Sequence, residues 1–220
     1  MTPTSAEPVH IAVFARAPVA GAAKTRLIPA IGAQAAARLH RKLVLQTLRT
    51  AYSAKIGPVT LWAAPDTEHH FFKALMNHGV TCRNQSDGDL GERMQHALSS
   101  TRPWPTLLVG SDCAPLRAEH LIAAADVLRA GNDAVFLPAE DGGYVLIGLN
   151  AEADPALFEN IPWGSAEVMR VTRSRLAELD YSWVEPVTLW DIDEPADLKR
   201  WLSETNPDGL NGLLPTTCEG

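Results

Sequence analysis

Three aspartates follow two apolar runs, where their carboxylates could hold a cation. Residues 106–109 predict a short buried strand, and Asp112 comes shortly after it. Asp191 and Asp193 follow a later apolar run, and an extended chain would point both to one side because only Ile192 separates them. Divalent cations prefer oxygen ligands, and open α/β sheets bind ligands outside the carboxyl ends of their strands. The spacing indicates a divalent cation site.

Two of these acids also have a purely structural interpretation. Asp112 could cap a helix that starts near Arg117. Asp193 could cap a helix over residues 196–202, and Pro195 suits the position just before that helix. The residue types alone leave both alternatives open.

A loop rich in small and basic residues follows the first apolar run. Its sequence is RAPVAGAAKTRL over residues 16–27. Cations and small residues directly after a first strand favour a phosphate-binding loop, although the spacing matches neither a P-loop nor a dinucleotide-binding fingerprint. The alternative is a solvated basic turn. The candidate phosphate ligands are Arg16, Gly21, Lys24, Thr25 and Arg26.

Residues 84–94 form a turn-rich segment that runs into a helix. Gly88 permits close backbone approach, and the start of the helix could bind a base or a ribose through Asp89 and Arg93. A capped helix, with Asp87 or Asp89 as the N-cap, is the structural alternative, and both interpretations can hold together.

Residues 138–144 form a glycine-rich turn that carries acids and an aromatic residue. Gly142 and Gly143 allow unusual backbone angles or close approach of a substrate, and Asp141 and Tyr144 could contact a sugar or an acceptor. A plain hairpin turn explains the two glycines but accounts less well for the acid before them.

The elements that must position these residues alternate between strands and helices. Apolar runs predict strands, and helical periodicity predicts helices between them. The predicted strands are 9–15, 59–64, 80–83, 106–109, 133–137, 145–149 and 183–189, and the longer helices are 34–54, 90–98, 119–129 and 166–179. This alternation predicts one three-layer α/β/α domain over residues 9–202, with a mostly parallel sheet and flexible tails at 1–8 and 203–220.

Composition excludes several classes of protein. The net charge is −7 and no basic run is visible, so nucleic acid is not expected as a partner. No apolar run reaches the length of a membrane span. Cys82, Cys113 and Cys218 lack the spacing of a zinc site, and free thiols fit a reducing cytoplasm, so we expect a cytoplasmic protein with Cys113 as a packing residue.

Six ordered segments resemble a small bacterial family described as glycosyltransferases. The segments are RAPVAGAAKTRL (16–27), GDLGERM (88–94), GSDCAP (110–115), DGGYVLIG (141–148), IPW (161–163) and DIDEPADL (191–198). Together they cover the chain from about residue 10 to residue 202. This chain departs from the family pattern at Arg16, where lysine is usual, at Ala20, where proline is usual, and at Pro115, which stands one place late.

The resemblance implies a nucleotide-diphospho-sugar transferase (GT-A-like) fold. It also implies that the first loop binds nucleotide phosphates and that Mg²⁺ or Mn²⁺ is held by Asp112 with Asp191 or Asp193. Asp112, Asp141 and Lys24 would then be the catalytic residues. The residues expected to contact the sugar or the acceptor are Asp141, Gly142, Gly143, Tyr144 and Trp163.

Two reactions, and one function without catalysis, are consistent with such a site. A glycosyltransferase would move a sugar from a nucleotide-diphospho-sugar to a small acceptor, with Asp141 as the candidate base. A nucleotidyltransferase would join a nucleotide to a phosphorylated small acceptor, and the absence of a full D-x-D at Gly110–Asp112 leans toward it. A nucleotide-binding module without catalysis is the third hypothesis. The fold alone does not choose among them.

Overall fold

The computed structural model describes residues 7–150 and 153–205. Within these residues seven strands form one sheet in the order β3-β2-β1-β4-β6-β5-β7. The strands are β1 (His10–Arg16), β2 (Val59–Ala64), β3 (Thr81–Asn84), β4 (Thr106–Gly110), β5 (Ala134–Pro138), β6 (Tyr144–Leu149) and β7 (Trp183–Val184). This confirms the predicted α/β class and the single sheet.

The sheet is mostly parallel, and one strand runs against the others. β1 pairs in parallel with β2 and β4, whereas β6 is antiparallel to both β4 and β5. The carboxyl end of β4 and the amino end of β6 therefore lie at the same edge of the sheet. The segments after β1, β2, β4 and β5 and the turn before β6 all meet along this edge.

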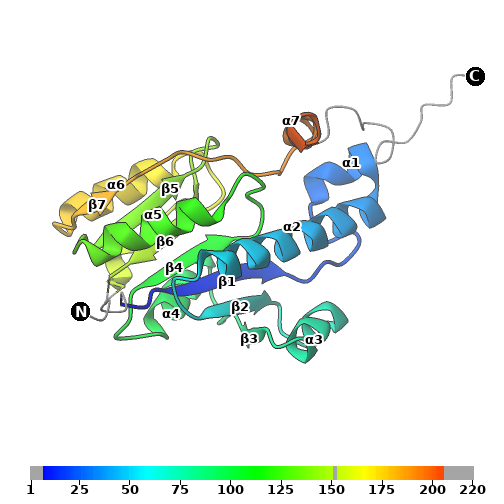
Figure 1. Ribbon diagram of the computed structural model, residues 1–220. Helices are drawn as coiled ribbons and strands as arrows, with labels where there is room; N and C mark the ends of the chain where they lie inside the picture. Colours follow the sequence, from blue (N-terminus) through cyan, green and yellow to red (C-terminus); the bar gives the residue numbers. More distant parts are fainter. Residues whose placement is uncertain (1–6, 151–152, 206–220) are drawn as a thin grey trace, which may run out of the picture.

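Helices cover both faces of the sheet. The helices are α1 (Ile28–Ile31), α2 (Ala33–Ala54), α3 (His70–Asn77), α4 (Leu90–Ser99), α5 (Ala118–Arg129), α6 (Val168–Glu178) and α7 (Pro195–Thr205), with short 3₁₀ turns η1 (Thr25–Leu27) and η2 (Pro155–Leu157). Figure 1 shows α2 and α5 lying side by side over the near face. None of the described helices is long and apolar enough to cross a membrane.

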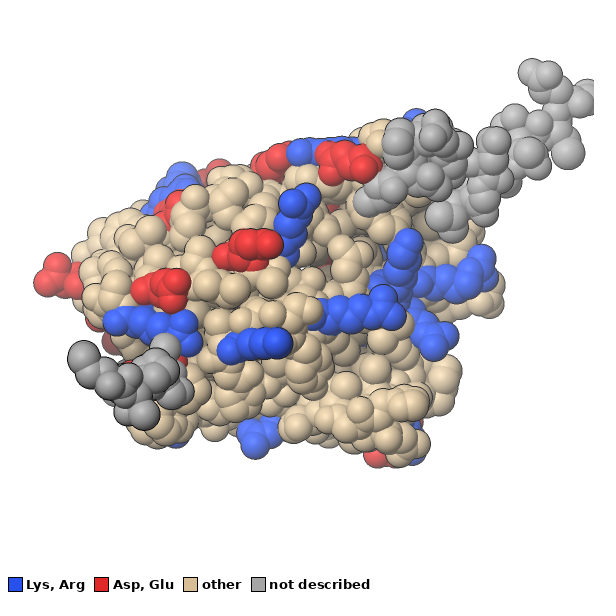
Figure 2. Space-filling model, in the orientation of Figure 1, with Lys and Arg blue, Asp and Glu red and all other residues tan. Residues whose placement is uncertain are grey.

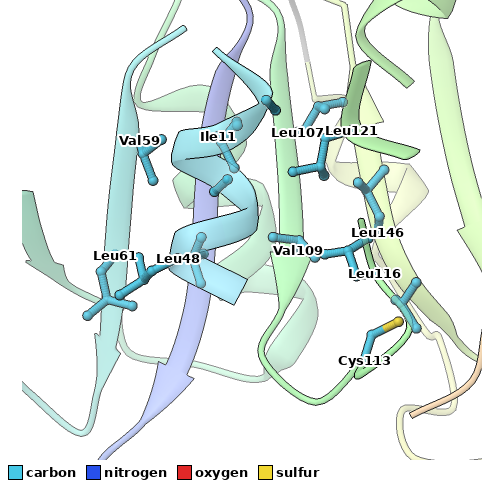
Figure 3. Packing of buried hydrophobic residues seen from close by; sticks show 14 of the residues in the cluster. Ile11, Leu48, Val59, Leu61, Leu107, Val109, Cys113, Leu116, Leu121 and Leu146 are labelled. Atoms are coloured by element: carbon cyan, nitrogen blue, oxygen red, sulfur yellow. The ribbon is translucent and has the colours of Figure 1, made fainter. Parts of the chain in front are cut away.

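One large apolar cluster joins α2, α3 and α5 to the sheet. Side chains of β1, β2 and β4 alternate across the sheet, so one set faces these helices and the other faces α4 and α6. Figure 3 shows Ile11, Val109 and Leu146 from three neighbouring strands in the first cluster. Cys113 packs at the end of this cluster, where burial raises the pKa of its thiol to about 12, as expected for a packing residue.

A third apolar cluster attaches the end of the chain to its beginning. Leu27 of the first loop and Leu39 and Leu43 of α2 pack against Ile192 and Trp201. The helix that carries Trp201 continues to Thr205, past the predicted domain boundary at residue 202. The other parts of the predicted tails, residues 1–6 and 206–220, lie outside the described residues.

The last strand is shorter than the sequence predicted. The apolar run 183–189 indicated one strand, but regular pairing covers only Trp183–Val184, followed by a single bridge between Ala139 and Leu189. Pro186 interrupts the run and has no N–H to donate to a neighbouring strand.

Basic side chains of α2 lie on the surface. Figure 2 shows Lys and Arg spread over the α2 part of the near face, with acidic residues mainly toward α5 and α7. The Arg41 guanidinium lies 5.6 Å from the centre of the Phe71 ring, and the Lys42 ammonium 4.5 Å from that of Trp201. These cations stack on neighbouring rings within the fold.

Candidate functional site

An ion pair between a buried lysine and a partly exposed aspartate lies at the edge where the strands end. The Lys24 Nζ is 3.0 Å from Asp112 Oδ2, and the Lys24 side chain is only 3% exposed whereas that of Asp112 is 41% exposed. The same ammonium donates to the backbone oxygen of Ile192 and lies 4.0 Å from Asp193 Oδ1. Lys24 thus joins three segments that are far apart in the sequence.

The backbone of the first loop directs Lys24 into this position. Lys24 adopts a left-handed conformation (φ 50°, ψ 48°) immediately before η1, and its carbonyl accepts a hydrogen bond from Leu27 N. Leu27 is fully buried in the cluster with Ile192, so the apolar anchor and the ion pair hold the same loop. A buried ammonium without an anion would be costly, and Asp112 supplies the anion.

His40 is a site residue that the sequence analysis missed. It lies on α2 with a buried ring, its Nε2 is 3.0 Å from the Arg16 backbone oxygen, and its Nδ1 is 3.6 Å from Asp112 Oδ1. Burial alone would raise the pKa of Asp112, but the neighbouring His40 ring and the Lys24 ammonium outweigh it and lower that pKa. Asp112 is therefore held as a carboxylate.

The two later aspartates meet this pair from the other side. Asp193 Oδ2 lies 2.6 Å from Arg26 Nη1, and Ile192 is buried between the two partly exposed acids. Ile192 N also donates to the Asp112 backbone oxygen at 3.0 Å, which fixes the segment beside β4. The pKa of Asp191 is raised to about 6, mainly by burial and then by Asp141, while Lys24 acts in the opposite direction.

The helix-capping alternatives for these acids are wrong. α5 begins after Arg117, whose backbone N–H is accepted by His120 Nδ1, and Asp112 takes no part in the cap. At α7 the Asp197 carboxylate accepts from the N–H groups of Asp193 and Glu194. The carboxylates of Asp112 and Asp193 are thus directed at Lys24 and Arg26.

A cavity of about 330 Å³ opens at the same edge of the sheet, and we call it the arginine pocket. It lies at the carboxyl ends of β1, β2 and β3. It is lined by Arg16, Ala17, Val19, Ala22, Ala64, Pro65, Gln85, Ser86, Asp87 and Arg93. Of the residues predicted to bind a nucleotide, Arg16 and Arg93 line it.

The remaining predicted nucleotide ligands lie outside its lining. Lys24 and Arg26 contact the acids, whereas Gly21 and Thr25 are exposed in the loop. Gly88 (φ +100°) turns the chain into α4, and its carbonyl accepts from Arg93 Nε at 2.9 Å.

Asp89 has the structural role that the sequence left open. Its carboxylate accepts a hydrogen bond from Glu92 N at 2.9 Å, and the Glu92 carboxylate accepts one from Asp89 N. The two bonds make a capping box at the start of α4. Asp87, the other proposed cap, lines the arginine pocket.

A second cavity of about 210 Å³ is lined by residues of β1, β4 and β6, and we call it the aromatic pocket. Its lining combines apolar side chains from both halves of the sheet with few polar ones. It is lined by Phe14, Leu90, Met94, Leu108, Gly110, Asp141, Gly143, Tyr144, Val145, Trp163, Gly164, Ser165 and Val168. Asp141, Gly143, Tyr144 and Trp163, all predicted to contact sugar or acceptor, are thus brought together.

The wall of the aromatic pocket is rigidly packed. The Tyr144 ring lies edge-on to Phe136 and Trp163, with centroid distances of 5.2 and 6.4 Å. Trp163 packs so closely on Gly91 that a β-carbon there would lie 2.9 Å from the indole. Such packing fixes the rings before any ligand binds.

The glycine pair controls where Asp141 points. Asp141 Oδ1 accepts from Gly143 N at 2.9 Å, so its other oxygen remains available in the pocket. Gly142 (φ +92°) carries this turn, and its carbonyl accepts from Met169 N at 2.8 Å. A side chain at Gly142 would meet the Ala166 backbone at 2.1 Å, so the turn is specific for glycine.

The acids offer a donor set that suits a hard cation arriving with phosphate. Asp112 Oδ1 is buried, and no described residue donates a hydrogen bond to it. Within the described ranges, no three His, Cys, Asp or Glu side chains gather closely enough to enclose a metal by themselves. Mg²⁺ is usually bound by one or two carboxylates plus substrate phosphates, and the pairs that Asp112 can form with Asp191 or Asp193 match that number.

Sequence comparison assigns the chain to a family. Residues 47–165, which are more than half of the chain, match the family DUF2064, described as uncharacterized proteins conserved in bacteria. The chain belongs to the DUF2064 family. No protein of curated function matches it in sequence.

Solved structures of this fold extend the comparison. A "putative nucleotide-diphospho-sugar transferase" from Desulfovibrio desulfuricans G20 is 28% identical, with a TM-score of 0.84 over 92% of this chain and 90% of that one. A CMP:2-keto-3-deoxy-manno-octonic acid synthetase complexed with CTP is 11% identical, with a TM-score of 0.59 over 90% and 98%. The chain has the nucleotide-diphospho-sugar transferase fold, which nucleotidyltransferases share.

The likeness to a third structure also concerns the fold alone. A 4-diphosphocytidyl-2C-methyl-D-erythritol synthase from Anaerococcus prevotii DSM 20548 is 13% identical, with a TM-score of 0.54 over 88% of this chain and 94% of that one. These comparisons confirm the predicted family resemblance and fold.

Proposed function

We propose that this DUF2064 protein is a metal-dependent glycosyltransferase that uses a nucleotide-diphospho-sugar. The observation that carries the proposal is that β1 contributes Arg16 to a polar pocket with two arginines and Phe14 to an apolar pocket that contains a carboxylate, while the Lys24–Asp112 pair lies at the same edge of the sheet. The nucleotide occupies the arginine pocket, and the acceptor enters the aromatic pocket. The similar D. desulfuricans protein, described as a "putative nucleotide-diphospho-sugar transferase", supports the choice of a nucleotide-diphospho-sugar as donor.

Each residue has a role that its position suggests. Arg16 and Arg93 hold the nucleotide in the arginine pocket, and Lys24 stabilises negative charge on the leaving diphosphate. An acceptor hydroxyl attacks the anomeric carbon, the bond from that carbon to the diphosphate oxygen breaks, and the nucleoside diphosphate leaves. The hydroxyl proton passes to the available oxygen of Asp141.

The same proposal includes Mg²⁺ or Mn²⁺ as a cofactor. Asp112 would hold it together with Asp191 or Asp193, since these carboxylates meet beside Lys24. Such a cation supplies charge stabilisation for a diphosphate.

Nucleotidyl transfer is the second candidate, and the position of Lys24 favours it. A buried ammonium that can approach a phosphate also suits attack on the α-phosphorus, in which a phosphate acceptor displaces pyrophosphate. The fold is shared with a synthetase solved with CTP. In this reaction Asp141 would have no proton to accept, so its substitution would leave the rate nearly unchanged.

The first test is a thermal-shift screen of nucleoside triphosphates and nucleotide sugars, with and without Mg²⁺ or Mn²⁺. A ligand at 100 times its Kd raises the stability of a protein by about 2.7 kcal/mol, which such a screen resolves. Metal-dependent stabilisation by a nucleotide sugar supports glycosyl transfer. Stabilisation by a triphosphate alone supports nucleotidyl transfer, and metal-independent binding without turnover would support a non-catalytic binding module.

The product formed with the ligand from this screen then separates the two reactions. Release of a nucleoside diphosphate indicates glycosyl transfer, and release of pyrophosphate indicates nucleotidyl transfer. Asp112→Asn should lower turnover at least about 100-fold without unfolding the protein. Asp126→Asn, which changes an exposed acid on α5, is the matched control. Unchanged turnover in Asp112→Asn would refute its role.

A further inference from the structure

The Lys24 ammonium occupies the position between the acids that a cation would take. Its nearest oxygens are Asp112 Oδ2, the Ile192 carbonyl and Asp193 Oδ1, which are the oxygen types that hard cations prefer. Only 3% of the side chain is exposed, so this contact is built into the fold.

A divalent cation on Asp112 would lie a few ångströms from this ammonium. Two like charges at such a distance repel strongly inside a protein. Lys24 cannot leave for bulk water without breaking its buried contacts, but its flexible stem can move the ammonium to another anion nearby. A diphosphate in the arginine pocket would provide that anion, because Arg16 lines the pocket and its backbone oxygen is linked through His40 to Asp112.

Asp193 is less dependent on Lys24 than Asp112 is. Arg26 lies 2.6 Å from the second oxygen of Asp193 and is 63% exposed, so this acid keeps a cationic partner when Lys24 moves. Asp112 has Lys24 as its close cationic partner, with the His40 ring at 3.6 Å. Competition should therefore be decided at Asp112.

We propose that Lys24 and the divalent cation compete for Asp112, so that the metal binds tightly only together with a phosphate ligand that draws Lys24 away. The inference rests on the proposed function only in its choice of metal and phosphate ligand. Lys24 acts as a built-in counter-ion that keeps the acids paired when no substrate is bound. Metal and nucleotide then bind cooperatively, since each removes an obstacle to the other.

The test measures Mn²⁺ binding by electron paramagnetic resonance in the absence of any nucleotide. Wild-type protein should bind Mn²⁺ weakly, and Lys24→Met should bind it about tenfold more tightly or better, because the competing charge is gone. Lys73→Met, which removes an exposed lysine of α3, is the matched control and should behave as wild type. Lys24→Arg, which keeps the charge, should also bind weakly.

A double variant locates the gained site. Lys24→Met with Asp112→Asn should lose the gain in Mn²⁺ affinity, and a gain that survives would place Mn²⁺ elsewhere and overturn the proposal.

If Lys24→Met does not fold, as far-ultraviolet circular dichroism would show, Lys24→Gln replaces it, since its amide can still donate to Asp112. Equal affinity of wild type and the neutral variant would also overturn the proposal. Neither nucleotide nor turnover enters these measurements, so failure of the transferase assignment would be seen separately.

Discussion

The two pockets lie at one edge of the same sheet but differ in chemistry. The arginine pocket is formed where parallel strands end, and loops supply its polar side chains. The aromatic pocket is formed around the antiparallel strand β6, whose inward side chains continue the apolar core. The parallel half of the sheet therefore carries a pocket with charged side chains, whereas the antiparallel half provides a rigid apolar wall with one carboxylate.

The largest expected effect is on the wall of the aromatic pocket. Gly142→Ala combines a left-handed backbone (φ +92°) with a β-carbon 2.1 Å from the Ala166 oxygen, so it should lower the free energy of unfolding by roughly 3–5 kcal/mol. Urea denaturation measures this loss. Gly21→Ala, beside the arginine pocket, has φ +87° but open space, and should lose only about 1 kcal/mol. Equal losses would contradict the contrast between a packed wall and an open loop.

The next effect separates the ligands of the two pockets. Arg16→Ala should weaken nucleotide binding about 10–100-fold, because a charge-assisted hydrogen bond is lost. Trp163→Ala should leave nucleotide affinity within about threefold but raise the KM for the acceptor, since it opens the aromatic pocket. Calorimetry with the nucleotide and steady-state kinetics with the acceptor distinguish them. A comparable loss of nucleotide affinity in both variants would show that one ligand spans both pockets.

The acids between the pockets predict a dependence on pH. The pKa of Asp191 is raised to about 6, so the folded state disfavours its ionised form, and this destabilisation grows as the pH rises from about 4 through 6. In chelator-containing buffer, Asp191→Asn should raise Tm at pH 7.5 by roughly 2–4 °C, the shift that about 1 kcal/mol gives in a domain of this size. Differential scanning calorimetry between pH 4 and 8 should show the gain shrinking toward acid pH. A gain in Tm that does not change with pH would show that the charge of Asp191 is not its cause.

The smallest expected effect concerns Asp89, which is close in sequence to Asp87 and Arg93 of the arginine pocket but does not line it. Asp89 caps α4, and serine can accept the same hydrogen bond, so Asp89→Ser should change stability by a few tenths of a kcal/mol. Asp89→Ala should lose about 1 kcal/mol. Nucleotide affinity should stay constant in both, as calorimetry measures. A clear loss of nucleotide affinity in Asp89→Ser would instead support the predicted contact between Asp89 and the nucleotide.

The sequence predicts the sheet well where strands are buried on both faces. The runs that became β1, β2 and β4 are almost entirely apolar, which matches a strand covered by helices on both sides. β7 was overestimated because apolar composition does not reveal whether a neighbouring strand is in register, and Pro186 ends the pairing early.

The part of the site that the sequence predicts best consists of acidic side chains that come directly after strands. Asp112 and Asp193 both lie within 4.0 Å of the Lys24 ammonium, so the two predicted acids come together at one edge of the sheet, but Lys24 was expected to bind phosphate and its ion pair with these acids was not predicted. His40 was missed because a histidine among buried helical positions looks like a core residue, although its place at 40, between buried 36 and 44, marks the inward face. The contribution of Ile192 is a backbone oxygen, which no side-chain pattern discloses.

The segment around Ile192 gives the protein an order of assembly. Lys24 and Asp112 are synthesised early, yet the carbonyl that receives the ammonium and the N–H that fixes the Asp112 backbone both belong to residue 192. α7 then covers this segment with Leu198 and Trp201. On the ribosome, Lys24 and Asp112 therefore lack these two backbone partners until residue 192 has been added to the chain.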